Sequence, residues 1–180
     1  WKKILIINSK VKKNDKVLIH AGSGGVGSFA IQYAKAKGAY VYTTTSTSNS
    51  EWVKNLGADR VIDYKTEDYK SIAKDLDIVF DTLGNNYTRE SFELIKSGGI
   101  VVSIVGPLDE ESARMFGMAD YKLPQDLSNA TKAYDATYKF IFMQPSNTHL
   151  NEIKLLVEDD EIKPIIDKVY PFTESIEAFE

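Results

Sequence analysis

The chain has 180 residues, of which 43% are hydrophobic and 27% are charged, and these values are typical of one globular domain. Its net charge of −4 is spread along the chain without basic clusters, which argues against binding to nucleic acid. The absence of cysteine excludes disulfides and thiolate metal sites, and no apolar run approaches the roughly 18 residues of a membrane span. We therefore expect a protein of the cytoplasm that acts on small molecules and has no membrane partner.

Short β-branched runs alternate with amphipathic segments along the chain. The first five runs are compact and mostly apolar, as in a parallel sheet that is buried on both faces. The predicted strands are Lys16–His20, Ala39–Thr44, Arg60–Asp63, Asp77–Asp81, Ile100–Val105 and Tyr138–Met143.

Helical segments separate these strands and end near Gly or Asp, which commonly terminate helices. The predicted helices are Val26–Lys37, Ser50–Leu56, Thr66–Lys74 with Thr66 as its N-cap, Tyr87–Ser97 and Ser146–Asp159. Residues 109–137 interrupt the alternation and predict helices or a loop at one edge of the sheet. We expect a short strand near Ile165–Val169 and the beginning of a helix in the last residues.

This alternation predicts a single α/β domain with a doubly wound parallel sheet, the Rossmann fold. The expected strand order is 3-2-1-4-5, with the sixth strand outside the fifth.

A glycine motif, Gly22-Ser23-Gly24-Gly25-Val26-Gly27, follows the first strand and opens the first helix. In this position G-x-G-x-x-G is typical of dinucleotide binding, with the pyrophosphate at the helix N-terminus. Gly22 would permit the tight turn, Gly24 would let the backbone approach the pyrophosphate, and Gly27 would let helix and strand pack closely. The alternative is a glycine-rich turn that binds nothing.

The second strand runs into hydroxyl and amide side chains, Thr45-Ser46-Thr47-Ser48-Asn49-Ser50, with no acid before Glu51. A dinucleotide site specific for NAD usually carries an acid here, on the adenosine ribose. Hydroxyls and amides can instead donate to a 2′-phosphate, so the run favours NADP over NAD. Lys54 or Arg60 could supply a positive charge. The same residues could alternatively form only a solvated turn that caps the helix at Ser50.

Four stretches of sequence, in this order, resemble the medium-chain dehydrogenase/reductase superfamily and its quinone oxidoreductase-like branch: "VLIHAGSGGVGSFAIQYAK", "LGADRVIDY", "VFDTLG" and "SGGIVVSIVG". A fifth, "IIDKVYPFTESIEAFE", is similar to the family's passage back to its catalytic domain. The resemblance implies that the Ser/Thr run and Tyr64 line the 2′-phosphate pocket. It also implies that the nicotinamide half of the cleft is formed by Leu83, Gly84, Val105 and Gly106.

Members of this family are two-domain enzymes in which a GroES-like catalytic domain precedes the cofactor domain. The resemblance implies that residues 1–15 form the connecting helix and that residues 16–180 form a Rossmann domain truncated at its C-terminus. It also implies that the catalytic residues lie on the absent domain, and that the full-length enzyme is a homodimer.

Zinc-dependent relatives bind their catalytic zinc through Cys and His of the other domain. This chain has no Cys and only His20 and His149, so we expect no zinc in it. We interpret His20, beside the glycine loop, as structural or loop-positioning and His149 as solvated. Tyr33 and Lys37 fit Y-x-x-x-K but fall inside the first helix, where we expect packing and a solvated lysine.

The sequence thus predicts the NADP(H)-binding half of an oxidoreductase that transfers hydride between a nicotinamide and a quinone, enone or other carbonyl. We expect this half alone to be inactive. The alternatives are a non-catalytic dinucleotide-sensing module and the cofactor domain of a zinc-dependent alcohol dehydrogenase. A methyltransferase is disfavoured because no acid ends the second strand.

Overall fold

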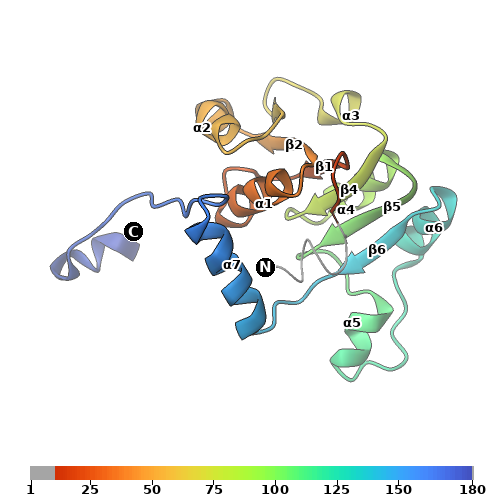
Figure 1. The fold of residues 1–180 in the computed structure, drawn as a ribbon. Coiled ribbons are helices and arrows are strands. Elements are labelled where there is room, and N and C mark those ends of the chain that lie inside the picture. The colour runs from red at the N-terminus through yellow and green to blue at the C-terminus, as the bar shows by residue number, and fades with distance from the viewer. Residues whose placement is uncertain (1–10, 180) are drawn as a thin grey trace.

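A computed structural model describes residues 11–179 and contains one six-stranded sheet in the order β3-β2-β1-β4-β5-β6 (Figure 1). All neighbouring strands are parallel. The predicted doubly wound single domain and its strand order are therefore confirmed. The strands are β1 (Lys16–Ile19), β2 (Tyr40–Thr45), β3 (Arg60–Asp63), β4 (Leu76–Asp81), β5 (Ile95–Ser103) and β6 (Thr137–Phe140).

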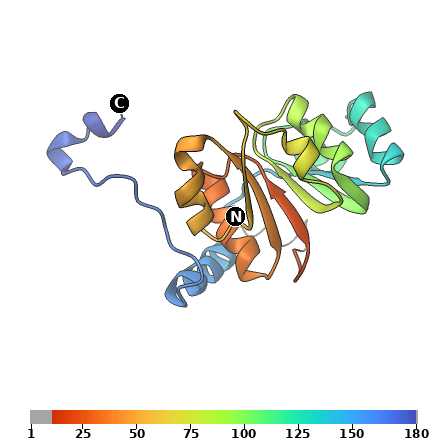
Figure 2. The same cartoon turned by 90° about the horizontal axis from the view of Figure 1, so that it is seen from above.

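Helices cover both faces of the sheet. One face packs against α1 (Gly25–Ala36), α2 (Ser50–Asn55) and α7 (Asn147–Glu158). The other face packs against α3 (Tyr69–Ile72), α6 (Gln125–Ala133) and the turn that follows α4 (Asn86–Glu90). A further helix, α5 (Glu110–Met115), lies between β5 and α6 in the chain. Figure 2 shows α7 on the side of α1 and α6 on the far side of the sheet.

The central strands β1 and β4 have mostly apolar side chains, which suits a sheet whose two faces are both buried. In β1, Val17 and Ile19 belong to the core cluster under α1, and Leu18 belongs to the cluster under α3 and α6. All three side chains have 0% exposure. This arrangement fixes the carboxyl end of β1, and with it the start of the glycine loop.

Two predicted helices are shorter than expected. The helix predicted over Thr66–Lys74 is only α3, and its N-cap is Asp68, whose side chain accepts from the Lys70 N–H at 3.0 Å, rather than Thr66. The helix predicted over Tyr87–Ser97 ends in a 3₁₀ turn, because Ile95 pairs with Leu76 and is buried as part of β5. Burial of Ile95 in the sheet thus outweighs local helix propensity.

The last residues differ most from expectation. The predicted strand near Ile165–Val169 is absent, since no described strand pairs with it, and 3₁₀ turns at Phe172–Glu174 and Glu177–Phe179 replace the expected helix. The side chain of Gln32 exchanges two hydrogen bonds with the backbone of Lys163, at 2.8 and 3.1 Å. Beyond this tether the segment leaves the body of the domain (Figure 1).

Most of the connecting helix expected over residues 1–15 lies outside the described residues, and residues 11–15 enter β1 through a turn. Among residues 11–179, no helix has the length and apolar character needed to cross a bilayer.

Candidate dinucleotide-binding site

The loop after β1 presents unpaired backbone donors at a helix N-terminus. Gly24 is the N-cap of α1 in an extended conformation, and no side chain caps the helix. The N–H groups of its first turn, from Gly25 to Gly27, therefore have no intrahelical acceptor. The first turn also carries no acid, so the positive end of the helix dipole is open to an external anion.

The glycines of the motif divide into two groups. A Cβ at Gly22 would lie 2.1 Å from the Thr43 hydroxyl, and one at Gly27 would lie 2.2 Å from the Ala21 carbonyl oxygen. These two positions require glycine for packing. A Cβ at Gly24 would meet only the Ala21 carbonyl at 3.4 Å, and one at Gly25 would meet nothing within 4 Å. Among residues 11–179, no side chain fills the space in front of this second pair, which leaves room for a ligand.

The residue of the turn with a left-handed backbone is Ala21, with φ of 52°, and not Gly22. The sequence motif assigned the tight turn to Gly22, whereas Gly22 is needed because it packs against Thr43 and the side chain of Ile31.

The polar run after β2 begins with a buried hydroxyl. Thr45 is 2% exposed, and its Oγ1 has no hydrogen-bond partner. Beyond it, the Ser46 hydroxyl lies 3.2 Å from that of Ser48 and accepts from the Asn49 side chain at 3.2 Å. The loop therefore combines one orphaned buried hydroxyl with a more exposed network of hydroxyls and an amide.

An acid that the sequence analysis missed lies beside this loop. Asp63, the last residue of β3, pairs in register with Thr45 and accepts from the Thr47 hydroxyl and from the Lys65 N–H. The hydrogen bond from Thr47, followed by that from Lys65, holds the pKa of this carboxyl below its usual range. The parallel register of β2 and β3 could have revealed this neighbour.

Lys54 and Arg60 were considered from the sequence as sources of positive charge for the loop after β2, and among residues 11–179 the structure shows no hydrogen bond or ion pair between either side chain and that loop. The Arg60 guanidinium pairs with Glu67 and donates to the Val61 carbonyl at 2.9 Å, so it is engaged on β3. Lys54 is exposed on α2.

The turn after β4 is organised by a buried carboxylate, Asp81, which is 0% exposed. Its Oδ1 accepts from the N–H groups of Leu83 at 2.9 Å and Gly84 at 2.8 Å. Its Oδ2 accepts from the hydroxyls of Thr88 at 2.5 Å and Ser103 at 2.9 Å. The hydrogen bonds of Asp81 thus connect the turn after β4 to Ser103 of β5.

The structure places the two turns assigned to the nicotinamide half next to each other. Gly84 has φ of +72°, and a Cβ there would lie 3.2 Å from Cγ2 of Val105. Gly106 donates to the Ser103 hydroxyl at 2.8 Å, and a Cβ on it would lie 2.6 Å from the Tyr138 hydroxyl. Gly84 is therefore required by the contact between the two turns, and Gly106 by its packing against Tyr138 and Ser103.

A cavity of about 400 Å³ lies on one side of the glycine loop, at the ends of β1, β2 and β4. Five predicted residues line it: Ser23, Thr45, Ser46, Tyr64 and Leu83. Asn49, whose amide belongs to the polar run considered from the sequence, also lines it, and the sequence analysis missed Ala21, Thr44, Tyr69 and Tyr87. Tyr69 and Tyr87 come from α3 and α4, and no pattern in the sequence directs these helices toward the loop.

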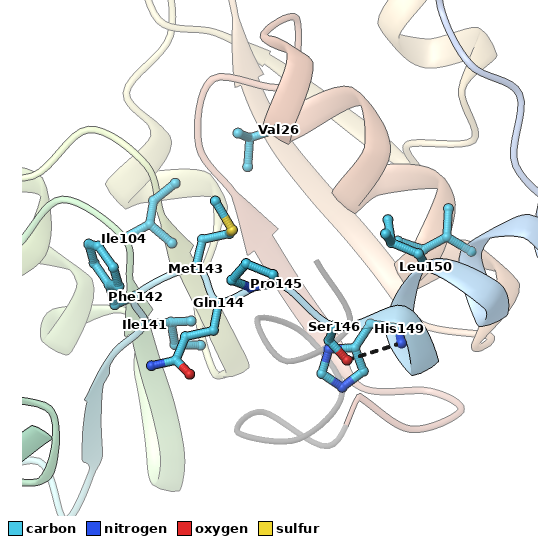
Figure 3. Close-up of a pocket in the computed structure, with 11 residues that line it drawn as sticks. Val26, Ile104, Ile141, Phe142, Met143, Gln144, Pro145, Ser146, His149 and Leu150 are labelled. Carbon is cyan, nitrogen blue, oxygen red and sulfur yellow. Dashed lines mark hydrogen bonds between the residues drawn. The ribbon is translucent and has the colours of Figure 1, made fainter.

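A second cavity, of about 500 Å³, lies beyond the end of β6 (Figure 3). Val26 is the only predicted residue in its lining, and the other residues are Ile104, Ile141, Phe142, Met143, Gln144, Pro145, Ser146, His149, Leu150 and Ile153. In Figure 3, Val26 of α1 lies across the cavity from Met143 and Pro145. The rule that ligands bind beyond the carboxyl ends of strands could have singled out the residues after β6.

His149, expected to be solvated, has intermediate exposure and lines this cavity. Its backbone N–H donates to the N-cap hydroxyl of Ser146 at 3.3 Å, which places it in the first turn of α7. The remaining predicted site residues lie outside both cavity linings, in the turns and loops around them: Gly22, Gly24, Gly25, Gly27, Thr47, Ser48, Gly84, Val105 and Gly106.

The donor set does not fit a zinc ion. Among the described residues, no three His, Cys, Asp or Glu side chains form a group that could hold a metal. His20 is fully buried between β1 and its neighbours, and His149 lies in a mostly apolar cavity.

Comparisons with known proteins agree with this geometry. Residues 56–180 match the family described as zinc-binding dehydrogenase. The mitochondrial NAD(P)H oxidoreductase RTN4IP1 of Mus musculus is 36% identical over 183 residues, which cover 96% of this chain and 46% of the relative. The chloroplastic NADPH-dependent alkenal/one oxidoreductase of Arabidopsis thaliana is 29% identical, over 97% of this chain and 39% of the relative.

Among solved structures, the quinone oxidoreductase from Coxiella burnetii superimposes with a TM-score of 0.76 at 31% identity. The match covers 98% of this chain and 51% of that structure, so the chain spans about half the length of the relatives it matches. On this evidence the chain belongs to the zinc-binding dehydrogenases of the medium-chain dehydrogenase/reductase superfamily, and it corresponds to their cofactor-binding half.

Proposed function

We propose that the chain is the NADP(H)-binding half of an oxidoreductase that transfers hydride between the nicotinamide and a quinone, enone or other carbonyl substrate. The observation that carries the proposal is the glycine loop, where Gly24 and Gly25 leave open space before the uncapped N-terminus of the 12-residue helix α1. The printed names of the mouse and Arabidopsis relatives, which specify NAD(P)H and NADPH, support it.

In this proposal each part of the site has a separate task. The N–H groups from Gly25 to Gly27 bind the pyrophosphate. The orphaned Thr45 hydroxyl and the cavity around it receive the adenosine half, because a buried hydroxyl without a partner is stabilised by a ligand that bonds to it. The turns at Gly84 and Val105, together with the apolar cavity at Val26, orient the nicotinamide and exclude water. The nicotinamide, when bound, supplies or accepts the hydride.

The preference for NADP rests on the end of β2, where hydroxyls stand in place of an acid. Each neutral hydrogen bond contributes only about 0.5–1.5 kcal/mol, and the neighbouring Asp63 carboxylate opposes a further negative charge. We therefore expect a modest preference, with NADPH bound only a few-fold more tightly than NADH.

The reaction, the substrate and the partners of the whole protein extend this proposal. The relatives are about twice as long as the chain, and we expect the chain alone to bind cofactor without turnover. Their zinc-binding family description keeps a zinc-dependent alcohol dehydrogenase as the second candidate, with its metal outside the described residues. A homodimer and a cytoplasmic location remain predictions, and the mouse relative is named as mitochondrial.

Isothermal titration of the chain with NADPH, NADH and S-adenosylmethionine tests the proposal. We expect binding of both nicotinamide cofactors, with NADPH favoured, and no binding of the methyl donor. Binding of S-adenosylmethionine alone would contradict the proposal, and tighter binding of NADH would overturn the assignment of NADP.

A further inference from the structure

His20, which precedes the glycine loop, belongs to a short chain of hydrogen bonds. This chain runs from His20 through the Thr44 hydroxyl to the Ala21 N–H, and we call it the relay. His20 is 0% exposed, and its Nδ1 lies 3.2 Å from the hydroxyl oxygen of Thr44 on β2. That hydroxyl also accepts from the Ala21 N–H at 3.2 Å, and the Thr44 carbonyl accepts from the Gly22 N–H at 2.9 Å. Thr44 therefore holds two consecutive amides at the beginning of the loop.

As part of this inference we assign to His20 the neutral tautomer in which Nδ1 accepts from the Thr44 hydroxyl. In this arrangement the Thr44 hydroxyl accepts from the Ala21 N–H and donates its own proton to Nδ1 of His20. The imidazole then carries its proton on Nε2, which has no hydrogen-bond partner. The ring lies edge-on against Tyr69 and Tyr87, at centroid distances of 5.2 and 5.4 Å. Burial keeps the ring neutral at pH 7, which preserves Nδ1 as an acceptor.

The relay ends on a residue with an unfavourable backbone conformation. Ala21 has φ of 52°, in the left-handed region that a Cβ disfavours. Its carbonyl accepts from the Gly24 N–H at 3.0 Å and lies against Gly27, where a Cβ would be only 2.2 Å away. The conformation of Ala21 therefore sets the position of Gly24 and of the first turn of α1.

We infer that His20 and Thr44 are positioning residues for the dinucleotide: their relay holds Ala21 in the left-handed conformation that aims the first-turn N–H groups of α1 at the pyrophosphate. The inference rests on the proposed function, since it assumes that this loop receives the pyrophosphate. His20 does not line the cavity beside the loop itself. It contacts three residues that do, namely Thr44, Tyr69 and Tyr87.

The test compares variants that remove or keep the hydroxyl. Thr44→Val removes it at nearly constant shape, and we expect NADPH to bind about tenfold more weakly, as for a loss of one to two buried hydrogen bonds. Thr44→Ser keeps the hydroxyl and should bind like the parent chain. In Thr44→Val with Ala21→Gly, the glycine adopts positive φ without strain, and we expect affinity to recover to within about threefold.

Glycine at position 21 also relieves backbone strain in the folded state, so urea denaturation of each variant accompanies the titration, and positioning predicts that affinity recovers by more than the free energy of unfolding does. Equal affinities for Thr44→Val and Thr44→Ser, or no recovery in the double variant, would overturn the inference. Should Thr44→Val fail to fold, His20→Asn, which keeps an acceptor near Nδ1, and His20→Leu, which lacks one, provide the same comparison.

NMR tests the relay without any ligand. We expect Cα and Cβ shifts of Ala21 typical of positive φ in the parent chain and in Thr44→Ser, but changed in Thr44→Val, and we expect ¹⁵N shifts of His20 that show the Nε2–H tautomer. An Nδ1–H tautomer, or unchanged Ala21 shifts in Thr44→Val, would contradict the relay. A parent chain that binds neither NADPH nor NADH would contradict the proposed function instead, while these shifts would still decide the relay.

Discussion

The turns that follow β1 and β4 lie next to each other at the carboxyl edge of the sheet, but they satisfy their backbone N–H groups in different ways. After β4, the buried Asp81 accepts from two backbone amides and two hydroxyls, so the turn is complete without a ligand. After β1, no side chain caps α1, and none of the residues that the structure describes fills the space before Gly25. The turn after β4 is thus a rigid support, whereas the turn after β1 is open to a ligand. The difference follows from the presence of one carboxylate, Asp81, in the turn after β4 and the absence of one in the turn after β1.

Replacement of Asp81 should give the largest effect. Asp81→Ala leaves four donors without their acceptor, three of them in buried hydrogen bonds and one in a partly buried one, and we expect the free energy of unfolding to fall by about 4 kcal/mol. Urea denaturation measures this change, with Asp120→Ala on the exposed surface as the control. A loss no larger than in the control would mean that Asp81 does not hold the turn together.

Low pH should destabilise the fold through protonation of His20, which precedes the loop after β1. Burial lowers the pKa of His20 from 6.5 to about 4, although Asp81 and Glu90 partly oppose this shift, and the rings of Tyr69 and Tyr87 complete its surroundings. Below pH 6.5 the unfolded chain binds a proton that the folded chain does not. Stability should therefore be complete above pH 6.5 and decrease as the pH falls toward 4, by up to about 3 kcal/mol.

Denaturant unfolding between pH 6.5 and 5 tests this effect, because carboxylates with lowered pKa values act mainly below that window. The slope of stability against pH should be smaller in His20→Asn, which cannot titrate. Equal slopes in the two chains would rule out His20 as the source.

A larger side chain at Gly25, in the open turn after β1, should weaken dinucleotide binding without destabilising the fold. Gly25→Val adds a side chain whose Cβ meets no atom of the described residues within 4 Å but occupies the approach to the helix N-terminus. We expect dinucleotide affinity to fall at least about tenfold, with little change in melting temperature. Asn147→Val, at the same first position of the equally long helix α7, is the matched control. Unchanged affinity in Gly25→Val would mean that the loop is only a turn.

The smallest expected effect concerns the choice of cofactor. Asp63→Asn removes the negative charge beside Thr47, and we expect NADPH affinity to rise about threefold while NADH affinity stays nearly constant. Ser46→Asp adds a charge in the same loop and should shift the preference the other way. Titration with both cofactors measures the two ratios, and a shift of Ser46→Asp toward NADPH would contradict this electrostatic account.

Sequence patterns predicted what depends on neighbours along the chain. Apolar runs identified the buried strands, and the glycine spacing located the loop at the start of α1. They missed what depends on register and packing: Asp63 reaches the β2 loop only because β3 pairs beside β2, and Tyr69 and Tyr87 line the cavity only because α3 and α4 pack over its edge. Helix propensity likewise failed at Ile95, where pairing with Leu76 decided the structure.

We expect the open turn after β1, and not the closed turn after β4, to receive the dinucleotide pyrophosphate. Addition of NADPH to the ¹⁵N-labelled chain, followed by two-dimensional NMR, tests it at the atoms concerned. We predict that the largest amide shifts fall on Gly25, Val26 and Gly27 and that those of Leu83 and Gly84, already bound to Asp81, are smaller. Saturable binding with no shift in the first turn of α1 would contradict the account.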